Sequence, residues 1–137
     1  MTGTPTSQPR SLPPRPAASP QARRGGWMKA SAATTAAYAL LLALLVIIIY
    51  TEDHSVLVPL VVFSAAGFAV AAAMAVSGRR STAWAAVGYS LIALAADGPH
   101  QIPEILHPQS ADHTAGAVVL IAGGLASLGV ALRAARG

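Results

Sequence analysis

Four stretches of apolar residues, separated by short polar segments, dominate the chain after Lys29. They cover Ala30–Tyr50, Val56–Ser77, Thr82–Ala96 and Thr114–Leu132, and none of them contains Asp, Glu, Lys, Arg or His. A helix that crosses a bilayer needs roughly 20 mainly apolar residues. Lipid offers no hydrogen-bond partner for open backbone groups, so such segments must be helical. The pattern therefore predicts transmembrane helices at about residues 30–50, 56–77, 82–97 and 114–132.

The third stretch is short for a transmembrane helix, but the distribution of charge indicates that it also crosses the membrane. If all four stretches cross, all nine Lys and Arg lie on one side of the membrane and all five acids on the other. Cytoplasmic loops are enriched in Lys and Arg. The sequence thus predicts four crossings of a plasma membrane, with the N- and C-termini in the cytoplasm. The acids on the outer side are Glu52, Asp53, Asp97, Glu104 and Asp112.

The composition agrees with a chain dissolved mainly in lipid. Hydrophobic residues make up 54% of it and charged residues 10%, whereas a soluble domain carries about 25% charged residues. The basic residues flank the apolar stretches, which is typical of contact with an anionic membrane surface and not of nucleic-acid binding. The absence of cysteine excludes disulfides and thiolate ligands. We expect the lipid bilayer as the main partner and no nucleic acid.

Residues 1–26 differ from the rest because they are rich in Pro, Ser, Thr and Arg and show no hydrophobic periodicity. Such a segment cannot bury enough apolar surface to offset its conformational entropy. We expect a disordered cytoplasmic tail over 1–26 and a four-helix transmembrane domain over 27–137, which together make an all-α integral membrane protein.

Polar residues inside the predicted helices are hydroxyl-bearing, and their default role is to hydrogen-bond neighbouring helices. The size and helix count resemble the small multidrug resistance transporters. Those proteins carry a glutamate in the middle of their first helix, whereas Ala30–Tyr50 contains no acid here. A small oligomeric transporter is therefore the third of our hypotheses. The hydroxyl-bearing residues are Thr34, Thr35, Tyr38, Ser64, Tyr89, Ser90 and Ser127.

The segment Asp97–His113 is the one unusual polar stretch, since it holds three of the four histidines. Asp97, His100, Glu104 and His107 follow a 3-4-3 spacing that would align them on one helical face. Imidazole and carboxylate groups suit divalent transition metals, and histidine could also report external pH. Pro99, Pro103 and Pro108 argue against a continuous helix, so we expect a loop with a short turn from Pro103 to His107. The simpler alternative is a solvated loop without a ligand.

No nucleophile arrangement, phosphate-binding loop or cofactor motif occurs in the sequence. We expect no enzyme and no cofactor, with a divalent transition metal as the exception if Asp97, His100, Glu104 and His107 form a site. The first functional hypothesis is a non-catalytic accessory or scaffold subunit that contacts other membrane proteins or a second copy of itself. The alternative is a metal-binding or pH-responsive protein that uses the outer His/carboxylate segment.

Overall fold

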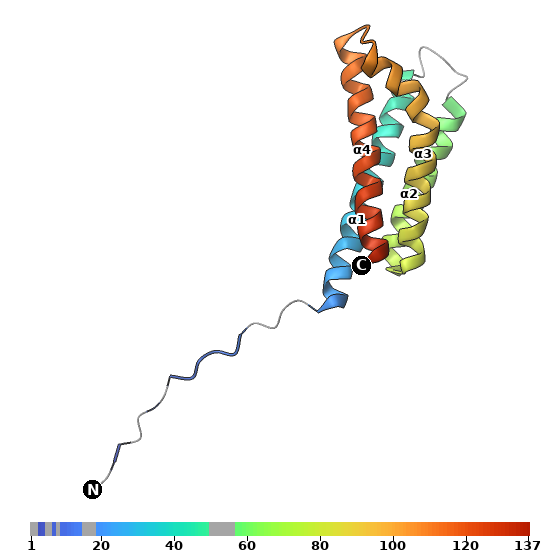
Figure 1. Ribbon diagram of the computed structural model, residues 1–137. Helices are drawn as coiled ribbons and strands as arrows, with labels where there is room; N and C mark the ends of the chain where they lie inside the picture. Colours follow the sequence, from blue (N-terminus) through green and yellow to red (C-terminus); the bar gives the residue numbers. More distant parts are fainter. Residues whose placement is uncertain (1–2, 5–6, 8, 15–18, 50–56) are drawn as a thin grey trace.

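The computed structural model describes residues 3–4, 7, 9–14, 19–49 and 57–137, and these residues contain helices and no strands. The helices lie side by side as an antiparallel bundle (Figure 1). This arrangement confirms the predicted all-α four-helix bundle. The segment with Glu52 and Asp53, which the sequence predicts to be on the outer side, lies outside the described residues. The helices are α1 (Pro20–Ile49), α2 (Leu57–Ser77), α3 (Arg80–Leu106) and α4 (Ala111–Arg136).

Small side chains let the helices approach closely. α1 packs along α2 and α4, and α3 packs along α4, whereas the seam between α2 and α3 is looser. One half of the core contains Met28, Met74 and Val87 among buried alanines. The other half contains larger side chains, namely Tyr38, Leu42, Tyr89 and Leu120 with Ala93.

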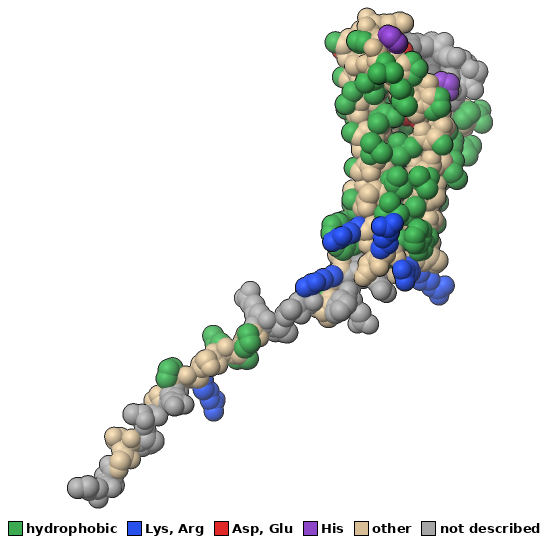
Figure 2. All heavy atoms as spheres, in the orientation of Figure 1, with side chains coloured by type: hydrophobic (Ala, Val, Ile, Leu, Met, Phe, Trp, Pro, Cys, Tyr) green, Lys and Arg blue, Asp and Glu red, His purple; other side chains and the backbone are tan. Residues whose placement is uncertain are grey.

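The two ends of the bundle differ in charge. Lys and Arg side chains gather where α1 begins and α4 ends, and histidines lie at the opposite end (Figure 2). We call these the basic end and the histidine end. The described acids, Asp97, Glu104 and Asp112, come after the apolar part of α3 and at the start of α4, on the histidine side. The described basic residues of the helical part include Arg23, Lys29, Arg79, Arg80, Arg133 and Arg136.

Three of the described helices are long and apolar enough to cross a membrane. They contain the segments Gly25–Ile47, Val58–Ser77 and Ala111–Arg136. α3 is also long, but Asp97, His100 and Glu104 in its C-terminal half lower its mean hydropathy. The chain is thus a membrane-associated helical bundle in which α3 is the most polar member.

α1 begins at Pro20, about ten residues earlier than the apolar pattern predicts. Ser19 explains the difference, because its hydroxyl accepts a hydrogen bond from the Ala22 amide at 3.2 Å. Proline is favoured in the first turn of a helix, where its missing N–H costs nothing. The predicted tail of 1–26 is therefore wrong for residues 20–26. The described residues before Ser19 form no helix or strand.

α3 continues to Leu106, through Pro99 and Pro103, so the predicted loop from Asp97 and the separate turn from Pro103 to His107 are wrong. Each proline removes one backbone hydrogen bond of the helix. The Thr114 hydroxyl of α4 donates to the Glu104 carbonyl at 3.4 Å and so connects the last turn of α3 to α4. The His107 amide donates to the Pro103 carbonyl at 2.8 Å and ends the helix.

Local residues define the starts of two helices. Ser110 caps α4 by accepting a hydrogen bond from the His113 amide at 3.3 Å, and Pro59 lies in the first turn of α2. Gly78, between α2 and α3, has a φ of 58°. Only glycine adopts this left-handed conformation readily, which lets α3 start two residues later.

Candidate functional site

A line of hydroxyl groups occupies the middle of the bundle. Ser127 of α4 lies between Thr35 of α1 and Ser90 of α3. The Ser127 hydroxyl oxygen is 3.0 Å from the Ser90 hydroxyl oxygen and 3.4 Å from the Thr35 hydroxyl oxygen. All three side chains are fully buried. The cluster joins three helices by hydrogen bonds, which is the packing role predicted for these hydroxyls.

Two tyrosines lie close to members of this cluster along the chain, Tyr38 one turn after Thr35 and Tyr89 next to Ser90. The rings of Tyr38 and Tyr89 meet edge to face, with centroids 6.3 Å apart. The Tyr89 hydroxyl donates to the Phe63 carbonyl at 2.9 Å and so connects α3 to α2. The Tyr38 hydroxyl is buried and has no hydrogen-bond partner among the described residues. Buried polar atoms of this kind are uncommon and call for an explanation.

Asp97 of α3 is the next polar group along the interior. Its Oδ1 accepts a hydrogen bond from Gln101 Nε2 at 3.1 Å. Its Oδ2 is buried and has no partner within the described part of the chain. The Tyr38 hydroxyl of α1 and the Asp97 Oδ2 of α3 are thus two buried oxygens without a partner in the described part of the chain.

Asp97 borders a pocket of about 270 Å³ between α1, α2 and α3. It lies next to the looser α2–α3 seam. The other polar side chain at the pocket is His100, which is exposed one turn further along α3. The remaining walls are apolar: Leu42, Pro59, Leu60, Phe63, Ala93 and Ala96. The site is therefore an apolar hollow with one carboxylate and one imidazole.

Of the four predicted metal ligands, the structure brings Asp97 and His100 to the same pocket. Glu104 is half-buried, and its Oε2 has no partner among the described residues. His107 is exposed beyond the end of α3. No three His, Asp or Glu side chains within the described ranges come together in a way that could hold a metal ion. The metal hypothesis stays a prediction without a gathered ligand set.

Sequence reasoning missed the residues that complete the pocket. Leu42, Leu60 and Phe63 come from helices far from Asp97 in sequence, and nothing in their local pattern relates them to it. One signal was available within α3. Ala86, Ser90, Ala93 and Asp97 follow helical spacing, so the buried face of the apolar stretch leads directly to the carboxylate.

Comparison of the chain with known proteins identifies no relative. The sequence matches no protein-family model, and neither the curated proteins nor the solved structures contain a match.

Proposed function

We propose that this chain is a multi-pass plasma-membrane protein that binds a small organic cation in the pocket between α1, α2 and α3, with Asp97 as the counter-charge. The observation that carries the proposal is the buried, unpartnered Asp97 Oδ2 beside an apolar hollow. An ionisable group inside a membrane bundle is costly, and such groups usually serve binding or transport.

The topology that supports the proposal has four crossings and cytoplasmic termini. Arg80 Nε, at the start of α3, donates to the Ala135 carbonyl at the end of α4 at 2.6 Å. From this contact α3 packs along the length of α4. If α4 crosses the membrane, α3 therefore crosses it too. The positive-inside rule then assigns the basic end to the cytoplasm.

The depth of Asp97 follows from the same arrangement. It lies about 26 Å along the helix axis from Arg80, at a rise of about 1.5 Å per residue. The hydrocarbon core is roughly 30 Å thick. In this topology Asp97 lies just inside the outer boundary of the core, so one ionisable residue does reach membrane depth.

The lining favours an organic cation over a metal ion. Leu42, Leu60 and Phe63 can cover an apolar body, and the Phe63 ring can face a positive charge. Asp97 can make a charge-assisted hydrogen bond to an ammonium group. A structural zinc site takes about four ligands, and this pocket offers two. Its 270 Å³ is slightly below the roughly 300–1,000 Å³ of drug-sized sites, which indicates a small amine.

A matched pair of probes tests the proposal on the full chain in detergent. Phenethylammonium carries the charge, and phenethyl alcohol has a similar shape without it. We expect saturation-transfer NMR and thermal-shift titration to give binding of the amine, and roughly tenfold weaker binding of the alcohol, since a hydrogen bond between charged groups is worth about 1.5–3 kcal/mol.

Asp97→Asn removes the charge and should weaken amine binding by about tenfold or more. Asp112→Asn, on the exposed first turn of α4, removes the same charge outside the pocket and should leave the affinity unchanged. Equal binding of amine and alcohol, or an equal loss in both variants, would contradict a site at Asp97.

A second candidate is the accessory or scaffold role, for which a different surface is relevant. A shallow groove of about 300 Å³ runs between the outer faces of α1 and α2, lined by Ala43, Val46, Val61, Ser64, Ala65 and Phe68. Small residues in such a groove allow close approach of another transmembrane helix. This role predicts a co-purifying membrane protein that is lost in Ala65→Trp and retained in Ala85→Trp, on the exposed face of α3.

A further inference from the structure

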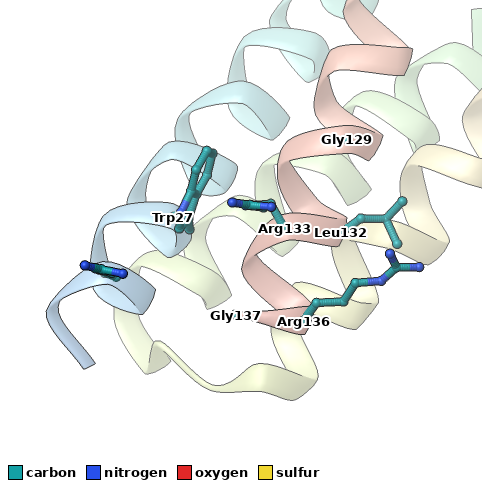
Figure 3. A pocket seen from close by; sticks show the side chains of 7 residues that line it. Trp27, Gly129, Leu132, Arg133, Arg136 and Gly137 are labelled. Carbon is teal, nitrogen blue, oxygen red and sulfur yellow. The ribbon is translucent and has the colours of Figure 1, made fainter. Parts of the chain in front are cut away.

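A second hollow, unrelated to the Asp97 pocket, lies at the basic end between α1 and α4. It has a volume of about 460 Å³ and is lined by three arginines, Arg23 of α1 and Arg133 and Arg136 of α4. Figure 3 shows Arg133 and Trp27 directed toward each other across the hollow. The Arg133 guanidinium carbon lies 5.4 Å from the centroid of the Trp27 ring. This contact holds one of the three charges in place.

Among the described residues, no acidic side chain opposes the three arginines of this hollow. No Asp or Glu lines it, and the described acids lie toward the histidine end. Arg80 at the same end is engaged differently, since it donates to the Ala135 carbonyl. Guanidinium groups bind phosphate oxygens in a two-pronged geometry. The hollow is therefore suited to a phosphate-bearing anion.

Other features of the hollow indicate a lipid as the source of that anion. Gly129 and Leu132 form its apolar part, and they belong to the segment of α4 that is apolar enough to cross a membrane. A Cβ at Gly129 would meet nothing within 4 Å, so this side of the hollow is open. Trp27 is 40% exposed, as expected of a tryptophan at the membrane interface.

The chain's own N-terminal tail is an unsuitable occupant, because residues 1–19 contain Arg10 and Arg15 and no acid. We infer that the hollow formed by Arg23, Trp27, Gly129, Arg133 and Arg136 binds the phosphodiester headgroup of an anionic phospholipid, with an acyl chain running past Gly129. Basic hollows between transmembrane helices are known sites for such headgroups. The inference goes beyond the proposed cation binding and does not depend on it.

Native mass spectrometry of the full chain in mild detergent tests this site with defined lipids. We expect dioleoyl phosphatidylglycerol to bind at least about tenfold more tightly than dioleoyl phosphatidylcholine. The double variant Arg133→Gln/Arg136→Gln should lose roughly thirtyfold in phosphatidylglycerol affinity. The control Arg10→Gln/Arg79→Gln removes the same charge away from the hollow and should lose less than about threefold.

Gly129→Leu gives an uncharged test that does not depend on the arginine variants folding. It fills the open side and should weaken phosphatidylglycerol binding while the far-ultraviolet circular dichroism stays that of the parent protein. Inorganic phosphate and glycerol 1-phosphate separate the lipid from a soluble anion. Equal losses in the two double variants, no preference for the anionic lipid, or displacement of the lipid by millimolar inorganic phosphate would each overturn the assignment.

Discussion

The Tyr89 ring lies directly against Gly67, so close that a Cβ on Gly67 would be 2.5 Å from the Tyr89 hydroxyl oxygen. The same Cβ would be 2.7 Å from the Ala39 Cβ, which cannot rotate away. Gly67 thus lets both α1 and α3 approach α2 closely at the same height along the bundle. This contact also places the Tyr89 hydroxyl at the Phe63 carbonyl, beside the wall of the Asp97 pocket.

Gly67→Ala should destabilise the bundle by about 1–3 kcal/mol, the range for overpacking a filled core. SDS titration of the purified protein, followed by circular dichroism, measures the change. Gly88→Ala is the matched control, because a Cβ there meets nothing within 4 Å. If both variants unfold at the same SDS fraction, the close contact between α2 and α3 is not present.

Ser127→Ala removes the central member of the Thr35–Ser127–Ser90 cluster. Interhelical hydrogen bonds in membranes average about 0.6 kcal/mol each, so we expect a loss of about 1 kcal/mol in the free energy of unfolding. The same SDS titration measures it. Ser81→Ala, on an exposed position of α3, should stay within about 0.5 kcal/mol of the parent. A neutral Ser127→Ala would show that the cluster does not hold the helices together.

Asp97→Asn should stabilise the ligand-free protein, since it replaces a half-buried carboxylate, whose Oδ2 has no partner among the described residues, by a neutral group. A gain of about 1 kcal/mol in the free energy of unfolding is the expected size. Asp112→Asn should instead lower the free energy of unfolding. It removes a favourable acid from the first turn of α4, at a cost of about 0.3–1 kcal/mol. A larger loss for Asp97→Asn than for Asp112→Asn would mean that the Asp97 charge is already satisfied within the protein.

The apolar pattern predicted most of the bundle because an apolar stretch within lipid must form a helix to satisfy its backbone hydrogen bonds. It set the four helices and, through the charges, their alternation. The pattern failed to predict where α1 begins and where α3 ends. Ser19 and Pro20 start α1 in a segment whose composition is that of a tail. Pro99 and Pro103 lie inside α3 although local rules favour a break there. The Thr114 hydroxyl of α4 contacts the last turn of α3, and a local pattern does not contain this contact.

The candidate site was predictable only in part. Asp97 and His100 stood out as ionisable residues that follow an apolar stretch, and their helical spacing placed them near each other. The spacing also suggested Glu104 and His107 as fellow ligands, but His107 lies beyond the helix end. The apolar walls, together with the unpaired Tyr38 hydroxyl, depend on how α1 and α2 dock against α3. That docking is set by tertiary contacts such as the one between Gly67 and Tyr89.

Metal content separates the original metal hypothesis from the organic-cation proposal. With two candidate ligands in the pocket, we expect no stoichiometric transition metal in tag-free protein measured by inductively coupled plasma mass spectrometry. The double variant His100→Ala/His107→Ala should then give the same reading as the parent. One metal per chain that disappears in the double variant would instead make Asp97, His100, Glu104 and His107 a metal site.

The central claim is that α3 crosses the membrane and carries Asp97 into the bundle interior. The chain has no cysteine, so single substitutions at Arg79 and Gln109, on either side of α3, can be labelled with a membrane-impermeant maleimide. In intact cells we expect Gln109→Cys to react at once and Arg79→Cys only after permeabilisation. Reporter fusions after Asp53, Arg80, Asp112 and Gly137 should alternate outside, inside, outside, inside. Labelling of both cysteines from the same side, or a fusion at Gly137 that reports from outside, would contradict the four-crossing bundle.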